Sequence, residues 1–131
     1  MAELFSAAWA NRFGEEWNKE AKLSGELAKI GFNSTIGYGF DGEPTPRAYI
    51  KVENGRVVAS GAYAGEALNW DLRASPESWK KWAESGIGMM ALGMAYTTRK
   101  LKFQVGDYMA MIKDPRMAGP FIESFNVMGR A

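Results

Sequence analysis

The sequence predicts a single α+β domain in which helices at both ends of the chain enclose a group of strands. Three patterns support this prediction. An aromatic stripe at helical spacing lies near the N-terminus, alternating apolar residues run through residues 33–74, and an uncharged run at 85–98 is followed by an alternating segment at 99–107. A chain of 131 residues is expected to form one domain over residues 1–131 and is long enough to bury a core.

Composition excludes several classes of function. The chain is 47% hydrophobic and 24% charged, as is typical of a soluble globular protein, and its formal net charge is +1. No block of basic residues offers a face for phosphates, so we expect no nucleic-acid partner. Cysteine and histidine are both absent, which excludes disulfides, Cys-His or Ser-His-Asp catalysis and the usual zinc sites. Carboxylates do not cluster with EF-hand spacing either, so no metal or other cofactor is expected.

The N-terminus carries Glu3 and lacks a basic region followed by an apolar run. A secretory signal would need both, so we expect a cytoplasmic protein.

The first helix is expected over residues 2–22, because apolar residues recur there on one face. These residues are Leu4, Phe5, Ala8, Trp9, Phe13 and Trp17. The favoured interpretation is a helix packed on the core; the alternative is a helix that also touches a membrane or the mouth of a cavity. A short helix over residues 24–30, ended by Gly31, is expected to follow.

Strands are expected from Asn33 onward. In the first, Ile36 and Tyr38 alternate with Gly37 and Gly39, and these glycines leave room for a segment packed close to the sheet.

The Asn54-Gly55 pair predicts a two-residue hairpin turn, because both positions favour positive φ, between strands at 48–53 and 57–63. A further strand at 68–74 places Leu68, Trp70 and Leu72 inward and Asn69, Asp71 and Arg73 outward.

The second half of the chain begins with a helix, because Ser75-Pro76-Glu77 supplies an N-cap, a proline at the first helical position and an acid in the first turn. Trp79 and Trp82 share one face of this helix. The uncharged run at 85–98 is too short to span a bilayer, which takes roughly 20 apolar residues, so we expect it to be buried in protein, either in the core or along a cavity. Asp107 is expected to cap a short helix before Pro115, and residues 118–128 are expected to be partly helical.

From Leu68 to Asp107 the order of these features resembles the sterol carrier protein 2 family. The matching features are the strand with Asp71 and Arg73, the Ser-Pro-Glu-Ser-Trp helix start, the Gly- and Met-rich helix, and the Arg-Lys-Leu-Lys-Phe-Gln-Val-Gly-Asp segment at 99–107. Arg99 stands where the family often has glycine, a departure that affects only the turn. The Asn54-Gly55 hairpin and the aromatic first helix extend the similarity to most of the chain.

The resemblance implies an SCP2-like fold: a mostly antiparallel five-stranded sheet covered by helices, with an apolar tunnel between them. It implies non-catalytic binding and transfer of a fatty acid, acyl-CoA, sterol or similar hydrophobic molecule. Apolar residues of the second half are then candidate ligand-binding residues, although each also fits a plain core position. They are Trp82, Met89, Met90, Met94, Phe103, Met109, Phe121, Phe125 and Met128.

Other interpretations stay open. Arg73, Arg99 and Lys100 are candidates for binding a polar headgroup at the cavity mouth. Transient membrane contact is a candidate property, and an accessory module that holds an apolar substrate for a partner enzyme is the alternative function. An enzyme would have to use a lone group, for which the available residues are Tyr38, Asp71, Tyr96 and Asp107, and this ranks last because no pair of them has a meaningful spacing.

Overall fold

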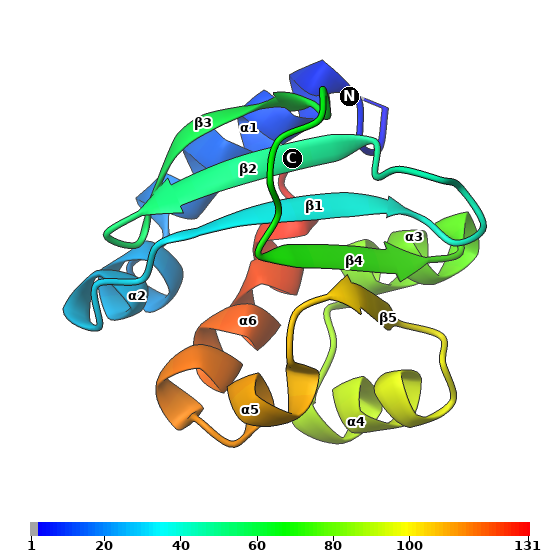
Figure 1. Cartoon of the computed structure of the whole chain (residues 1–131). Helices are drawn as coiled ribbons and strands as arrows, with labels where there is room; N and C mark the ends of the chain where they lie inside the picture. Colours follow the sequence, from blue (N-terminus) through cyan, green and yellow to red (C-terminus); the bar gives the residue numbers. More distant parts are fainter. Residues whose placement is uncertain (1–2) are drawn as a thin grey trace.

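The computed structural model describes residues 3–131, which form a five-stranded sheet in the order β3-β2-β1-β4-β5 (Figure 1). The strands are β1 (Ser34–Phe40), β2 (Ala48–Glu53), β3 (Arg56–Ala62), β4 (Trp70–Ala74) and β5 (Lys102–Val105). Only the central β1–β4 pair is parallel; the other three pairs are antiparallel. The prediction of a mostly antiparallel five-stranded sheet is therefore confirmed.

Helices cover one face of this sheet (Figure 1). They are α1 (Ala7–Lys19), a π-helical turn (Ala21–Gly25), α2 (Glu26–Lys29), α3 (Pro76–Ser85), α4 (Met89–Thr97), α5 (Tyr108–Ile112) and α6 (Pro115–Met128). The predicted caps are present: Ser75 accepts from the Ser78 amide, and Asp107 accepts from the Ala110 amide at 3.0 Å. The order of elements is the one that the sequence predicts.

The first helix packs on the core, as the favoured interpretation requires. It begins at Ala7, where Ser6 is the N-cap, rather than at residue 2, which lies outside the described residues. Trp9, Phe13 and Trp17 are all at most 3% exposed. The aromatic part of the stripe is thus buried against the sheet rather than presented to a membrane, whereas Ala8 is exposed and Leu4 is only partly buried.

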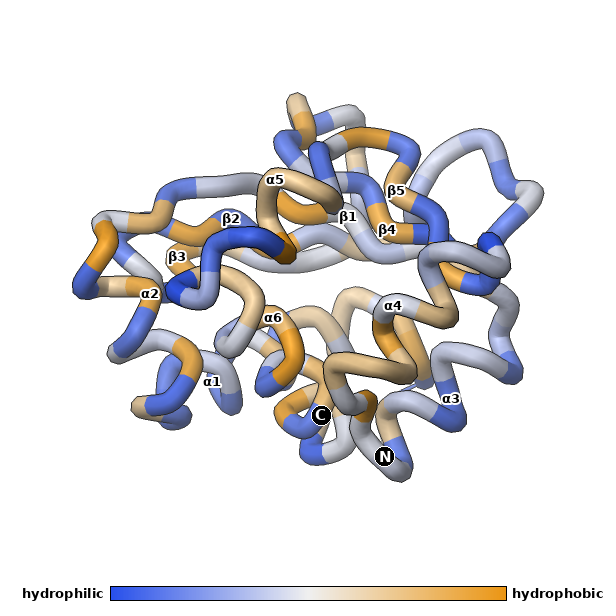
Figure 2. Tube along the Cα trace, turned by 90° about the horizontal axis from the view of Figure 1, so that it is seen from below, coloured by the Kyte–Doolittle hydropathy of each residue, from blue (hydrophilic) through white to orange (hydrophobic). Residues whose placement is uncertain are grey.

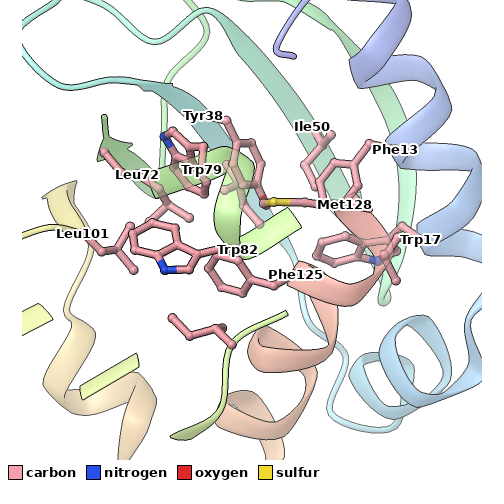
Figure 3. Packing of buried hydrophobic residues seen from close by; sticks show 14 of the residues in the cluster. Phe13, Trp17, Tyr38, Ile50, Leu72, Trp79, Trp82, Leu101, Phe125 and Met128 are labelled. Carbon is pink, nitrogen blue, oxygen red and sulfur yellow. The ribbon is translucent and has the colours of Figure 1, made fainter. Parts of the chain in front are cut away.

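Aromatic rings fill the space between α1, α3 and the sheet (Figure 3). Tyr38 on β1 contacts Phe13 and Trp79 edge-on, with ring centroids 5.5 and 6.0 Å apart. The Trp79 indole N–H donates to the Gly39 carbonyl at 2.9 Å, so this fully buried ring also satisfies its polar atom.

The opposite face of the sheet is covered by the chain's own connections. The segment from β3 to β4 crosses over β2 and β1 (Figure 1), and a Cβ built on Gly39 would meet the Pro46 backbone at 2.7 Å. Gly37 is also approached closely, by the Leu68 and Pro46 side chains. The space that the sequence predicts beside these glycines is therefore filled by loop residues.

Asp71 and Arg73 lie on this covered face and form a buried ion pair. Both Asp71 carboxylate oxygens accept from the Arg73 guanidinium, at 2.6 and 3.0 Å, and Arg73 also donates to the Glu43 carbonyl at 2.6 Å. The sequence predicts the correct face for both residues, but that face is covered rather than solvated. Arg73 is consequently not at a cavity mouth, and its candidacy as a headgroup ligand is wrong.

Two turns follow the expected backbone chemistry. Asn54 and Gly55 both have positive φ, +48° and +81°, which confirms the predicted hairpin turn. Arg99 has a φ of +61°, in the left-handed region that favours glycine, so the expected departure from glycine at this position lies in a turn that disfavours an arginine.

The uncharged run at 85–98 departs most from expectation. Leu92 and Ala95 of α4 are buried, but Met89, Met90 and Met94 are 50%, 88% and 64% exposed. The prediction that this run is buried in protein is therefore wrong for its three methionines.

Candidate functional site

A small apolar cavity lies between the sheet and the helices. Its volume is about 40 Å³. The lining comes from helices at both ends of the chain and from the two central strands: Trp17, Leu23, Leu27, Phe32, Ile36, Tyr38, Trp70, Leu72, Met111, Met117, Pro120, Phe121 and Ser124.

The sheet wall of the cavity is built by the parallel pair β1 and β4. Ile36 pairs with Trp70 and Tyr38 with Leu72, so four lining side chains emerge on the same face from two pairs that are separated by the Gly37–Asp71 pair. These are the residues that alternation predicts to point inward, and their hydrogen-bonded backbone makes this wall the fixed part of the site.

The opposite wall is mainly α6, with α5 beside it. Asp114 caps α6 and Pro115 occupies its first turn, whereas Pro120 stands in the helix interior. An interior proline has no N–H to donate and typically destabilises or kinks a helix. Because Pro120 and Phe121 both line the cavity, the weakest point of the α6 hydrogen-bond ladder lies against the candidate site.

The lining residues carry no charge. Their polar groups are mostly engaged: the Trp17 indole donates to the Gly55 carbonyl at 2.9 Å, and the Ser124 hydroxyl donates to the Phe121 carbonyl. Burial raises the pKa of the Tyr38 phenol far above its ordinary value, so this group stays neutral at physiological pH. The site can therefore exclude water and surround apolar groups, and among the described residues that line it there is no base, acid or metal-binding set.

The size of the cavity limits what it can contain as it stands. A water molecule needs roughly 10–15 Å³ of such volume, so about 40 Å³ accommodates a few waters and not a lipid. A larger ligand requires that a wall move. The structure therefore does not show the expected tunnel but only this small cavity.

The candidate ligand-binding residues separate into three groups. Phe121 lines the cavity, and Phe103 lies one ring away from it, with centroids 6.0 Å from both Phe121 and Trp70. Trp82, Phe125 and Met128 are buried in the core behind it, at 8%, 0% and 3% exposure (Figure 3).

The third group is exposed. Met89, Met90, Met94 and Met109 direct between 48% and 88% of their surface to solvent and do not line the cavity. Lys100 lies beside Met94 in a groove between α3 and α4, away from the cavity.

Several lining residues were not anticipated, notably Leu23, Leu27, Met111 and Met117. Leu23 and Leu27 are four residues apart, a spacing that places them on one helical face and could have identified them. For Met111 and Met117 no local signal exists, because their role depends on how two short helices sit on the sheet.

Within residues 3–131 no helix is long and apolar enough to cross a membrane. The same residues contain no group of three or more His, Cys, Asp or Glu side chains arranged to bind a metal ion.

The fold is that of the sterol carrier protein 2 class. The crystal structure of a sterol carrier protein 2 superimposes with a TM-score of 0.77 and 18% identity, over 98% of this chain and 99% of that one. The solution structure of a conserved hypothetical protein from Thermus thermophilus, considered a candidate sterol carrier protein, gives a TM-score of 0.67 and 16% identity over 98% and 92%.

A third solved structure, UbiJ-SCP2, a ubiquinone synthesis protein, gives a TM-score of 0.60 and 10% identity over 92% of this chain and 88% of that one. No family model matches the sequence, and no curated protein sequence matches it either. The predicted resemblance to the sterol carrier protein 2 family is confirmed at the level of the fold, along the whole described chain.

Proposed function

We propose that this protein binds a hydrophobic molecule non-covalently in the cavity between β1, β4 and α6, and that it carries out no chemistry on it. The observation that carries the proposal is the uncharged lining, shared between a rigid sheet wall and a helix weakened by Pro120. The similarity in fold to sterol carrier protein 2 supports it.

Binding would require α6 or α5 to move outward, because the cavity as it stands is too small for a lipid. Affinity would come from apolar surface removed from water, at roughly 25 cal/mol per Å² before the costs of association and opening. Pro120 makes α6 the wall that is easiest to displace, whereas the hydrogen-bonded pair β1–β4 stays in place.

The lining favours a neutral ligand over an ionised one. Transfer of a carboxylate into an apolar site without a cationic partner is very costly, and none of the described lining residues is cationic. Of the expected ligand classes, sterols and other uncharged lipids therefore fit better than a fatty acid whose carboxylate is buried.

The first test is native mass spectrometry of the purified protein, followed by organic extraction of what it carries. A bound neutral lipid of defined mass is the expected result. In a second assay, palmityl alcohol and palmitate are titrated against tryptophan emission, because Trp17 and Trp70 line the cavity. The alcohol should bind roughly tenfold more tightly or better, and equal affinities would contradict the neutral-ligand preference.

A pair of variants on α6 localises the binding. Because each variant adds a tryptophan, binding of the alcohol is followed here by native mass spectrometry. Met117→Trp fills the cavity and should abolish binding, whereas Asn126→Trp, at an exposed position of the same helix outside the lining, should leave it unchanged. Binding that survives Met117→Trp would place the ligand elsewhere. Failure of every lipid to bind the wild-type protein would overturn the proposed function.

A second candidate function is an accessory module that presents an apolar substrate to a partner enzyme. Its support is the structural neighbour that is a ubiquinone synthesis protein. Co-purification of the tagged protein with an enzyme from its native extract would favour this function, and a lone monomer would count against it.

A further inference from the structure

The exposed methionines of α4 and α5 are together called the methionine face: Met89, Met90, Met94 and Met109. The two helices are held together by the Tyr96 and Tyr108 rings, which stack with centroids 3.9 Å apart. Both helices face the viewer in Figure 2 and are coloured toward the hydrophobic end of the scale.

Helix α4 is apolar on all sides. Leu92 and Ala95 are buried on its inner side, the methionines occupy its outer side, and no residue between Glu84 and Arg99 is charged. A surface helix normally turns a polar face to water, and a helix that is apolar all round is normally covered. The outer side of α4 is therefore apolar but exposed, since each of its three methionines is at least half exposed.

Three cations lie near the α4 part of this face. Lys81 and Lys100 line a groove together with Met94, and Arg99 immediately precedes Lys100. Among residues 3–131 none of these three cations forms an ion pair, so their charges are available to an anionic partner. No acidic residue occurs between Glu84 and Asp107.

We propose that the methionine face is a docking surface for an anionic lipid bilayer. Flexible, polarizable methionine side chains suit a fluid, irregular surface such as the acyl boundary of a membrane. Each lysine or arginine held near an anionic membrane raises the partition coefficient about fivefold, so Lys81, Arg99 and Lys100 supply the electrostatic part of the attraction.

The same cations argue against a second copy as the occupant. A two-fold contact whose axis passes close to Lys81, Arg99 and Lys100 would bring like charges together, and these would repel.

Docking would bring the membrane close to the candidate cavity. On α5, Met109 belongs to the methionine face and is 48% exposed, whereas Met111 is 4% exposed and lines the cavity. A bilayer docked on the methionine face would therefore be separated from the candidate cavity only by α5, which is five residues long.

The test is vesicle flotation, which needs no knowledge of the cavity ligand. The protein is mixed with vesicles of pure phosphatidylcholine, or of phosphatidylcholine with roughly a third of phosphatidylglycerol, at low and at high salt. We expect flotation with the anionic vesicles at low salt, and weaker flotation at high salt or with the zwitterionic vesicles, since screening removes the electrostatic part.

Variants then locate the surface. The triple variant Met89→Gln/Met90→Gln/Met94→Gln should lower the partition coefficient roughly tenfold or more, and Lys81→Gln/Lys100→Gln should lower it on anionic vesicles by a similar factor, at about fivefold per charge. Val58→Gln, on an exposed residue of β3, is the matched control and should float like the wild type. Circular dichroism melts check that all of these variants are folded.

Three results would overturn the proposal: no flotation with anionic vesicles, flotation that the methionine variant does not reduce, or flotation that Val58→Gln reduces equally. A dimer in sedimentation velocity that the methionine variant dissociates, without vesicle binding, would assign the face to a second copy instead. Lipid binding in the cavity is measured separately, so failure here leaves the proposed function standing.

Discussion

The aromatic core under α1 and α3 and the methionine face of α4 and α5 are both strongly apolar, but they relate to water in opposite ways. In the core, Phe13 and Trp79 are 0% exposed, and the centroid of each ring lies 4.9–6.1 Å from those of neighbouring aromatic rings. On the methionine face, Met90 is 88% exposed. The difference shows that local hydrophobicity does not decide burial; a helix is buried by what packs on it.

The flanking residues explain the contrast. Helix α1 has a charged outer side, so only its aromatic stripe can be buried. Helix α4 has no charged side, so its sequence does not determine which side is buried. Leu92 and Ala95 are buried because other elements of the fold pack on that side. The predictions below test this contrast in order of decreasing effect on stability.

The largest effect is expected from Trp79→Ala. The substitution opens a cavity among Tyr38, Trp82 and Phe125 and also removes the hydrogen bond to the Gly39 carbonyl. We expect a loss of about 3–5 kcal/mol in the free energy of unfolding, measured by urea denaturation. A loss below about 1 kcal/mol would show that this core is not the main source of stability.

The next largest effect is expected at the buried Asp71–Arg73 ion pair on the other face of the sheet. Asp71→Ala leaves the Arg73 guanidinium buried with carbonyl acceptors only, and we expect a loss of about 3 kcal/mol, the low end for breaking a buried ion pair, in the same urea assay.

The double variant Asp71→Leu/Arg73→Met is the control for this pair, because it removes both charges together. It should be clearly more stable than Asp71→Ala, since no unpaired charge remains. Equal destabilisation of the two variants would show that the loss is one of packing.

The contrast between buried and exposed apolar residues can be tested with two methionines, Met111 in the cavity wall and Met90 on the methionine face. Met111→Gln places an amide in the apolar cavity wall and should cost about 1–3 kcal/mol, whereas Met90→Gln should change the unfolding free energy by less than about 0.5 kcal/mol. Thermal melts of both variants measure this. Similar losses for both would mean that α4 is covered in solution by another surface.

The smallest effect appears at alkaline pH. Because burial raises the pKa of Tyr38 in the folded state, the folded protein keeps this proton while the unfolded chain, with a pKa of about 10, releases it. The contribution of Tyr38 to the free energy of unfolding is therefore constant below about pH 10. Above about pH 10 it falls by up to about 1.4 kcal/mol per pH unit.

Urea midpoints measured at neutral pH and near pH of about 11 would check this. Tyr38→Phe removes the titrating group, so its stability should fall less steeply than that of the wild type. Tyr108, whose pKa burial also raises, remains in both proteins and cancels in the difference. Parallel pH profiles would mean that the Tyr38 phenol ionises as freely when folded as when unfolded.

What the sequence predicts correctly is local. The Asn54-Gly55 turn, the caps at Ser75 and Asp107 and the alternation through Ile36, Tyr38 and Leu72 all depend on residues within one or two turns of the chain. Each of these residues has a backbone or burial preference that no distant contact overrides.

What the sequence misses is decided at a distance. The burial of Asp71 and Arg73 depends on a loop that folds back over the sheet, and the exposure of Met89 and Met94 depends on how the described elements leave the outer side of α4 uncovered. The cavity wall at Met111 and Met117 likewise depends on where two helices meet. Periodicity shows which residues share a face but not what that face meets.

The small volume of the cavity has a consequence for the rate of binding if the proposed function is correct. A lipid would then enter only those molecules in which α6 or α5 has moved, so the apparent dissociation constant would equal the intrinsic one divided by the fraction of such molecules. At high lipid concentration the observed association rate should level off at the rate of helix opening instead of rising without limit. Pro120 would then control the timing of exchange, because a substitution that strengthens α6 should slow both entry and release while leaving the uncharged lining intact.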